Sequence, residues 1–123
     1  MEKTVLIVDD DDKLSKMLGF LFMAKGFKAE YARNGGDALD KLKGIKPGVI
    51  ILDIMMPGMD GYEVCRKIKE DPATKDIPII ALSALSETQG KEDMISLGAY
   101  YYFEKPFKSS DLVEKAIEAL EKS

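Results

Sequence analysis

The chain has 123 residues, 46% of them hydrophobic and 33% charged, which is typical of one globular domain with its own hydrophobic core. Its formal net charge of -4 provides no general attraction to nucleic acid or to an anionic membrane surface, so neither is an expected partner. The single cysteine excludes an internal disulfide framework, and the lack of histidine excludes a zinc site of the Cys/His type.

The first apolar run, Val5-Leu6-Ile7-Val8, is rich in β-branched residues and predicts a short β-strand. Four residues are too few for the apolar core of a signal peptide, and no segment approaches the length of a transmembrane helix. We therefore expect a cytoplasmic protein that is not inserted in a membrane.

Four aspartates, Asp9 to Asp12, follow this strand directly. Apolar residues then recur at helical spacing, at Leu14, Met17, Leu18, Leu21 and Phe22. Gly26 ends the predicted helix. Aspartates at the start of a helix cap it and complement its dipole, which accounts for Asp11 and Asp12. One cap does not need four acids, so Asp9 and Asp10 are candidate functional residues.

Residues 27–32 alternate like a second strand, Asn34-Gly35-Gly36 predicts a turn, and a short amphipathic helix ends near Gly44. The next apolar run, Val49-Ile50-Ile51-Leu52, predicts a strand buried on both faces, as in a parallel sheet. It ends in Asp53, and Pro57-Gly58 interrupts the chain soon afterwards. Ligands of open α/β sheets bind beyond the carboxyl ends of the strands, so Asp53 is either a functional carboxylate or merely the start of a loop.

Asp60 and Glu63 have the spacing of a capping box and predict the start of a third helix. Its inward face contains Val64, Cys65 and Ile68. On that face Cys65 is expected to be a small core residue rather than a reactive thiol.

The fourth strand, residues 77–82, ends at Ser83. Ser86 and Gln89 can cap the next helix, in which Gly90 and few apolar positions indicate a weakly held element. Residues 99–103 predict the fifth strand, Lys105-Pro106 follows it, and the last helix begins at about Ser110.

Five strands that alternate with five helices indicate an α/β fold with a parallel sheet covered on both sides. We expect a (βα)5 flavodoxin-like three-layer sandwich, with a five-stranded sheet in the order 2-1-3-4-5. Residues 1–123 are then one domain. Because the last helix completes this fold, we expect no DNA-binding output domain within these residues.

The parallel sheet brings the chemically active side chains to one edge, where its strands end. Those side chains are Asp9, Asp10, Asp53, Ser83 and Lys105. Three carboxylates so close together cannot all stay ionised unless a cation joins them, and oxygen ligands at an open edge suit Mg²⁺. A carboxylate with a metal, a lysine and a hydroxyl around it has what is needed to form an aspartyl-phosphate.

The whole chain resembles the receiver domain of two-component response regulators, the chemotaxis-Y-like family. Four segments carry the resemblance, in order and at the right spacing: Val5-Leu6-Ile7-Val8-Asp9-Asp10, residues 52–61 from Leu52-Asp53 through Met55-Met56-Pro57-Gly58 to Gly61, Ala81-Leu82-Ser83-Ala84, and Lys105-Pro106-Phe107. Each segment alone is a weak signal, but the four together are specific.

The resemblance implies that Asp53 accepts a phosphoryl group from the phosphohistidine of a sensor histidine kinase or phosphotransfer protein. It implies Mg²⁺ as cofactor, bound by Asp10, Asp53 and the Met55 backbone carbonyl, with Asp9 acting through water.

The resemblance further implies that Lys105 binds the phosphoryl group, that Ser83 is the switch hydroxyl and Tyr102 the switch aromatic, and that the bond before Pro106 is cis. Such a protein catalyses only its own phosphorylation and dephosphorylation. It meets a downstream protein target on the surface of the fourth helix, fifth strand and fifth helix.

Two alternatives remain open. A haloacid-dehalogenase-like phosphatase also carries an Asp-x-Asp after its first strand, as Asp9 and Asp11 do here, but Lys13 is unusual at its position and Asp53 would have no role. A receiver-like module could instead bind a partner without phosphorylation. The phosphoryl group would lie on Asp53 in a receiver and on Asp9 in a phosphatase, and a pure interaction module would carry none.

Overall fold

Five strands and five helices alternate along the residues that the computed structural model describes, which are 3–55, 60–84 and 88–122, with the backbone alone at 88–90. The strands are β1 (Lys3–Val8), β2 (Phe27–Ala32), β3 (Val49–Asp53), β4 (Ile79–Ser83) and β5 (Tyr101–Glu104). The helices are α1 (Asp12–Ala24), α2 (Gly35–Lys41), α3 (Gly61–Glu70), α4 (Thr88–Ser96) and α5 (Ser109–Lys122). None of the helices described here combines the length and the apolar character that crossing a membrane requires.

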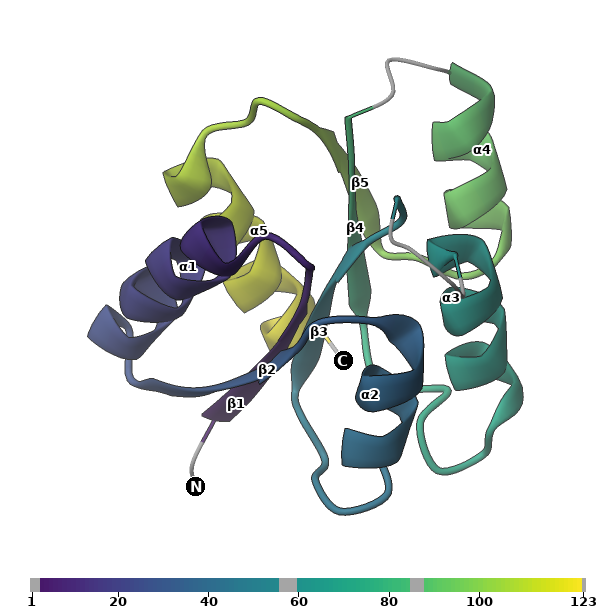
Figure 1. Cartoon of the computed structure of the whole chain (residues 1–123), viewed down its shortest axis with the longest axis horizontal. Coiled ribbons are helices and arrows are strands. Elements are labelled where there is room, and N and C mark those ends of the chain that lie inside the picture. Colours follow the sequence, from purple (N-terminus) through teal and green to yellow (C-terminus); the bar gives the residue numbers. More distant parts are fainter. Residues whose placement is uncertain (1–2, 56–59, 85–87, 123) are drawn as a thin grey trace.

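The strands form one sheet in the order β2-β1-β3-β4-β5, and all neighbouring strands are parallel. Helices α1 and α5 cover one face of the sheet and α2, α3 and α4 cover the other, so the molecule has three layers (Figure 1). The predicted flavodoxin-like architecture and strand order are confirmed.

The core lies on both sides of the central strand β3, all five residues of which are buried. Val49 and Ile51 pack in the cluster under α1 and α5, whereas Ile50 and Leu52 pack in the cluster under α2, α3 and α4. Side chains alternate between the faces of a strand, so a strand covered on both faces has to be apolar throughout. This is why the run that ends in Asp53 contains no polar residue before it.

Several predicted boundaries differ from the structure: the fourth strand begins at Ile79 rather than at residue 77, and the second helix ends at Lys41 rather than near Gly44. Asn34 does not merely open a turn: its side chain accepts a hydrogen bond from the Asp37 amide (2.8 Å) and caps α2, which begins at once with Gly35. The fifth strand begins at Tyr101 rather than at Ala99, because the Ala99 amide donates to the Met94 carbonyl (3.0 Å) and belongs to the end of α4. Ser86, the predicted cap of α4, and the predicted Pro57-Gly58 turn lie outside the described residues.

Helix α3 starts directly against the end of β3. The side chain of Asp60 accepts a hydrogen bond from the Glu63 amide (2.9 Å), as the capping prediction requires, and the Gly61 amide donates to the Ile54 carbonyl (3.1 Å). A Cβ atom at Gly61 would collide with the backbone of Ile54, so only glycine allows this approach. The two ends of the loop after Asp53 are thereby held together.

Candidate functional site

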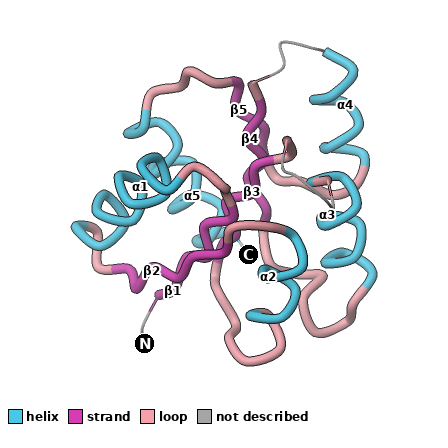
Figure 2. The backbone as a smooth tube through the Cα atoms, in the orientation of Figure 1, coloured by secondary structure: helices cyan, strands magenta, loops and turns pink. Residues whose placement is uncertain are grey.

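Four strands bring the predicted site residues to the same edge of the sheet. Asp9 follows β1, Asp53 ends β3, Ser83 ends β4, and Lys105 follows β5. The loops that leave these strands emerge on one side of the sheet (Figure 2). The strand order therefore converts positions far apart in the sequence into neighbours.

Three carboxylates meet at this edge: each of Asp9, Asp10 and Asp53 has an oxygen within 4.8 Å of the others. Asp9 and Asp53 are 1% and 3% exposed, whereas Asp10 is exposed to solvent. One oxygen of each buried carboxylate is held by a backbone amide two residues later, from Asp11 to Asp9 Oδ1 (2.9 Å) and from Met55 to Asp53 Oδ1 (3.0 Å). The Oδ2 atoms of both residues are left for other partners.

Lys105 bridges the two buried carboxylates. Its Nζ lies 3.3 Å from Asp9 Oδ2 and 3.3 Å from Asp53 Oδ2. Burial lowers the pKa of this ammonium group, but the attraction of Asp53 and then of Asp9 outweighs burial, so the pKa of Lys105 lies above its usual value. The side chain remains charged under any physiological condition.

The pKa of the Asp9 carboxyl group is raised in this site. Burial, the largest cause, and the nearby Asp53 raise its pKa from 3.8 to about 6, against the opposing effects of the Asp11 amide and Lys105. The raised pKa of Asp9 is therefore first an effect of burial, to which the second carboxylate adds. The carboxylate oxygens provide the hard ligands that Mg²⁺ prefers, and they fit a divalent cation.

The other predicted site residues lie on, or shortly after, β3, β4 and β5 and differ in their exposure. Met55 is 52% exposed beside Asp53. Ser83 is fully buried, pairs in register with Glu104, and accepts the Lys105 amide at its carbonyl (2.7 Å). Tyr102 pairs with Ala81 and is only 5% exposed, so its ring already points into the core. The peptide bond between Lys105 and Pro106 is cis.

The second pair of aspartates separates from the first, as predicted. Asp11 Oδ1 accepts hydrogen bonds from the amides of Lys13 (3.1 Å) and Leu14 (3.2 Å), which makes it the cap of α1. Asp12 lies in the first turn and pairs with Arg33 (3.4 Å). The Asp11 carboxylate is thus used by the helix.

Cys65 is fully buried in the core under α3, and burial raises the pKa of its thiol to about 11. The prediction of a core residue is confirmed. The sequence prediction missed the two amides, of Asp11 and Met55, that orient the buried carboxylates. An aspartate at the end of a strand commonly accepts the amide two residues later, and this spacing was the available signal.

Comparison with known proteins agrees with this geometry. The family model described as the response regulator receiver domain matches residues 5–117. The phosphate regulon transcriptional regulatory protein PhoB of Pseudomonas aeruginosa is 38% identical over 113 residues, which cover 92% of this chain and 49% of that protein.

Two solved structures have the same fold. The crystal structure of a candidate response regulator from Chloroflexus aurantiacus is 34% identical, with a TM-score of 0.92 over 98% of this chain and 99% of that one. Chemotaxis protein CheY4 of Vibrio cholerae is 28% identical, with a TM-score of 0.89 over 97% of this chain and 99% of that one. By contrast, the chain spans about half the length of the curated relatives it matches.

Proposed function

The chain belongs to the response regulator receiver domain family, and from this premise we propose that it is a phosphorylation-dependent signalling switch whose phosphoryl acceptor is Asp53. The donor is the phosphohistidine of a sensor histidine kinase or phosphotransfer protein. The observation that carries the proposal is the buried Asp53 carboxylate, with Lys105 Nζ 3.3 Å from its Oδ2 and two further carboxylates beside it.

In the proposed transfer, a carboxylate oxygen of Asp53 attacks the phosphorus atom. The bond between phosphorus and the donor's imidazole nitrogen breaks, and that nitrogen keeps the electron pair. The Met55 amide fixes the orientation of the nucleophile through Oδ1. Lys105, already fixed against Oδ2, stabilises the charge that develops on the phosphoryl oxygens, and the Ser83 hydroxyl donates to one of them.

Mg²⁺ is the proposed cofactor, held by Asp10, Asp53 and the Met55 carbonyl, with Asp9 acting through water. When bound, it supplies the positive charge that neutralises phosphoryl oxygens. The three clustered carboxylates, with the single Lys105 ammonium group between two of them, support a cation at this position. The proposed chemistry is the protein's own phosphorylation and dephosphorylation, as suits a signalling switch.

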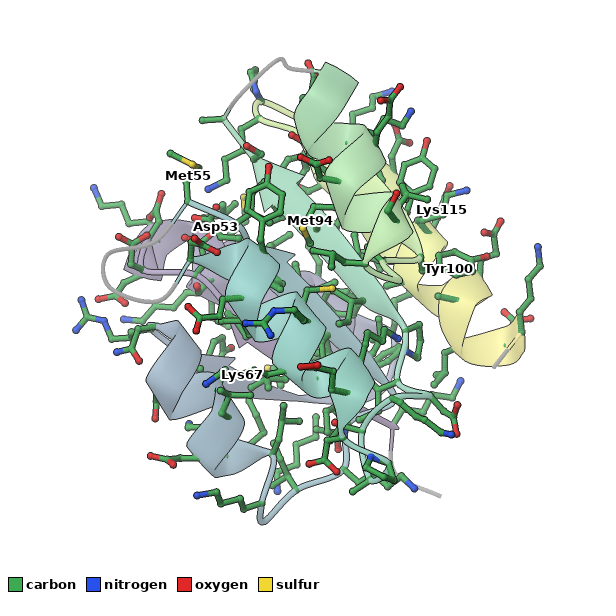
Figure 3. The ribbon with its side chains drawn as sticks, turned by 90° about the vertical axis from the view of Figure 1, so that its right-hand side faces the viewer. Asp53, Met55, Lys67, Met94, Tyr100 and Lys115 are labelled. Atoms are coloured by element: carbon green, nitrogen blue, oxygen red, sulfur yellow. The ribbon has the colours of Figure 1, made fainter. Side chains whose placement is uncertain are left out.

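The proposed output surface consists of α4, β5 and α5 and meets a downstream protein. Figure 3 has Tyr100 and Lys115 on this side of the molecule, away from Asp53 and Met55. Lys115 Nζ lies 4.5 Å from the centre of the Tyr101 ring, and the hydroxyl of Tyr100, the residue before β5, donates to Glu118. Polar contacts thus link α5 to β5 and to the residue that precedes it. Such contacts can be rearranged at small cost.

Ser83 and Tyr102 are proposed to connect the two regions. Because Tyr102 is already buried in this structure, phosphorylation would stabilise its inward position rather than bring it about. Coupling of this kind raises partner affinity by typically about 1–3 kcal/mol. Ser83→Ala should leave Asp53 phosphorylatable but suppress the change in amide chemical shifts on α4 and β5. Equal shifts in Ser83→Ala and the parent protein would contradict this connection.

Labelling with acetyl phosphate and Mg²⁺, followed by intact and peptide mass spectrometry, tests the acceptor. We expect one acid-stable, base-labile acyl phosphate on Asp53 and none in Asp53→Asn, which keeps the size of the side chain but removes the nucleophile. Labelling on Asp9 would favour the phosphatase alternative. A folded protein that takes up no phosphoryl group would favour the interaction module.

A further inference from the structure

A cavity lies beside the acidic site, between α1, the end of β2 and α2. Its volume is about 620 Å³, in the range of sites for small organic molecules. Asp9 is shared with the acidic site, but the remaining walls come from residues to which the proposed phosphoryl transfer assigns no role. These walls include Ser15, Lys16, Phe20, Tyr31 and Lys41.

Two aromatic rings form the apolar part of the cavity. Phe20 remains 70% exposed although it is a large apolar side chain. Tyr31 reaches across to α1 at Gly19, where a Cβ atom would collide with the tyrosine hydroxyl. The absence of a side chain at Gly19 makes room for Tyr31 in this position. A flat apolar ligand would cover surface on both rings that is otherwise exposed to water.

The hydroxyl of Ser15 is a buried polar group without a hydrogen-bond partner among the described residues. The residue is 5% exposed, and among the described residues no partner lies within hydrogen-bond distance of its hydroxyl oxygen. A buried hydroxyl without a hydrogen bond is unfavourable, so such a group needs a reason. Because a serine side chain turns between staggered rotamers, this hydroxyl can rotate toward an oxygen of a bound molecule.

The charges around the cavity favour an anion. Asp12 is paired with Arg33 and Asp9 with Lys105, which leaves Asp37 as the remaining carboxylate of the lining. Asp37 lies in the first turn of α2, where the helix dipole compensates its charge. Within the described part of the chain, Lys16 and Lys41 have no carboxylate within 4.0 Å. The lining contains three carboxylates and three basic side chains, so it carries no net charge, and Lys16 and Lys41 are the two ammonium groups that an anion can reach.

We propose that this cavity binds a small aromatic organic anion. The ring of the ligand lies against Phe20 and Tyr31, a ligand oxygen accepts the Ser15 hydroxyl, and the anionic group lies near Lys16 and Lys41. The site does not depend on phosphorylation of Asp53, so the proposal stands or fails independently of the proposed function.

Titration of the full chain with naphthalene-2-carboxylate, followed by ¹⁵N NMR, tests the site. We expect saturable shifts confined to α1, the end of β2 and α2. The neutral analogue naphthalene-2-carboxamide should bind at least about fivefold more weakly, because it lacks the negative charge that faces the two lysines. Absence of saturable shifts, or equal affinity for the two probes, would overturn the proposal.

Two matched variants on α1 separate the cavity from a generally sticky helix. Phe20→Ala should weaken binding of naphthalene-2-carboxylate by about tenfold, whereas Met23→Ala, at a 54% exposed position outside the cavity, should leave it unchanged. Equal losses would mean that the probe only coats the exposed face of α1.

Ser15→Ala tests the hydroxyl. The variant should fold with unchanged or higher stability, since it removes an unpartnered polar group, but it should bind the probe about three- to tenfold more weakly. Unchanged affinity in this folded variant would contradict the proposed contact.

Discussion

Two half-buried lysines, at opposite ends of the parallel strands, show how the partner of a buried ammonium group determines the direction of its pKa shift. Lys105 faces the carboxylates of Asp9 and Asp53, and its pKa is raised. Lys69 donates instead to the backbone carbonyls of Lys75 (3.0 Å) and Ile77 (2.8 Å), and burial lowers its pKa, against the weaker effects of Cys65 and Asp76. Full charges compensate desolvation and neutral dipoles do not.

The two lysines have different roles in the protein. Lys69 ties the end of α3 to the segment that enters β4, so its role is to hold backbone together. Lys105 lies among groups of opposite charge whose balance changes as soon as a phosphoryl group or a cation arrives. Only the second region is suited to respond to chemistry, and the following experiments separate the two.

The largest difference is expected in phosphorylation rate. Lys105→Met should slow uptake of phosphoryl from acetyl phosphate by about 100-fold, because it removes a positioned charge that stabilises the transferring group. Lys69→Met should change the rate by less than about twofold, since that side chain lies at the opposite edge. Rates come from mass spectrometry of quenched samples. Equal slowing in the two variants would show that the loss reflects the fold and not the site.

The aspartates at positions 9 to 12 should likewise differ in how much they contribute to Mg²⁺ affinity. Asp10→Ala removes a proposed ligand and should weaken Mg²⁺ binding by at least about tenfold. Asp12→Ala should cost less than about 1 kcal/mol of stability, because Asp12 lies in the first turn of α1 while Asp11 is its cap. Isothermal titration calorimetry measures the first effect and urea unfolding the second. If both variants lost Mg²⁺ affinity equally, the cluster would have no defined ligand set.

Stability should be more sensitive at Lys69. Lys69→Ala leaves two carbonyls without their donor and removes the stem that packs near Gly98, so we expect a loss of about 2 kcal/mol in the free energy of unfolding. Lys69→Met keeps most of the stem and should lose less. Circular dichroism during urea unfolding measures both values, and a loss in neither would remove the structural role from Lys69.

The smallest expected effect is a dependence of Mg²⁺ affinity and of stability on pH, which arises from the acidic site and not from Lys69. Asp9, with its pKa raised to about 6, is protonated below that value, so Mg²⁺ affinity should fall by about tenfold between pH 7 and pH 5. Without metal the sign is opposite for folding: the contribution of Asp9 to stability is complete below about pH 4 and is lost as the pH rises through 6. Asp9→Asn should flatten both profiles.

The sequence was sufficient for the architecture because the central strands carry uninterrupted apolar runs, β2 alternates, and α1, α3 and α5 carry periodic apolar positions. It was also sufficient to bring Asp9, Asp10, Asp53 and Lys105 together, since parallel strands end at one edge. The double contact of Lys69 with Lys75 and Ile77 could not be predicted, because it depends on how the loop after α3 folds back. The already buried Tyr102 could not be predicted either, since strand alternation gives the face of a side chain but not its depth.

The bond between the Gly61 amide and the Ile54 carbonyl has a consequence for how such a protein can diversify. The chain leaves β3 and enters α3 at almost one point, so a side chain at position 61 would push the start of α3 away from Ile54. That displacement would reach Asp53, the residue directly before Ile54. Position 61 can therefore change little, whereas exposed positions farther along α3, such as Arg66 and Lys67, can be exchanged without disturbing the acceptor.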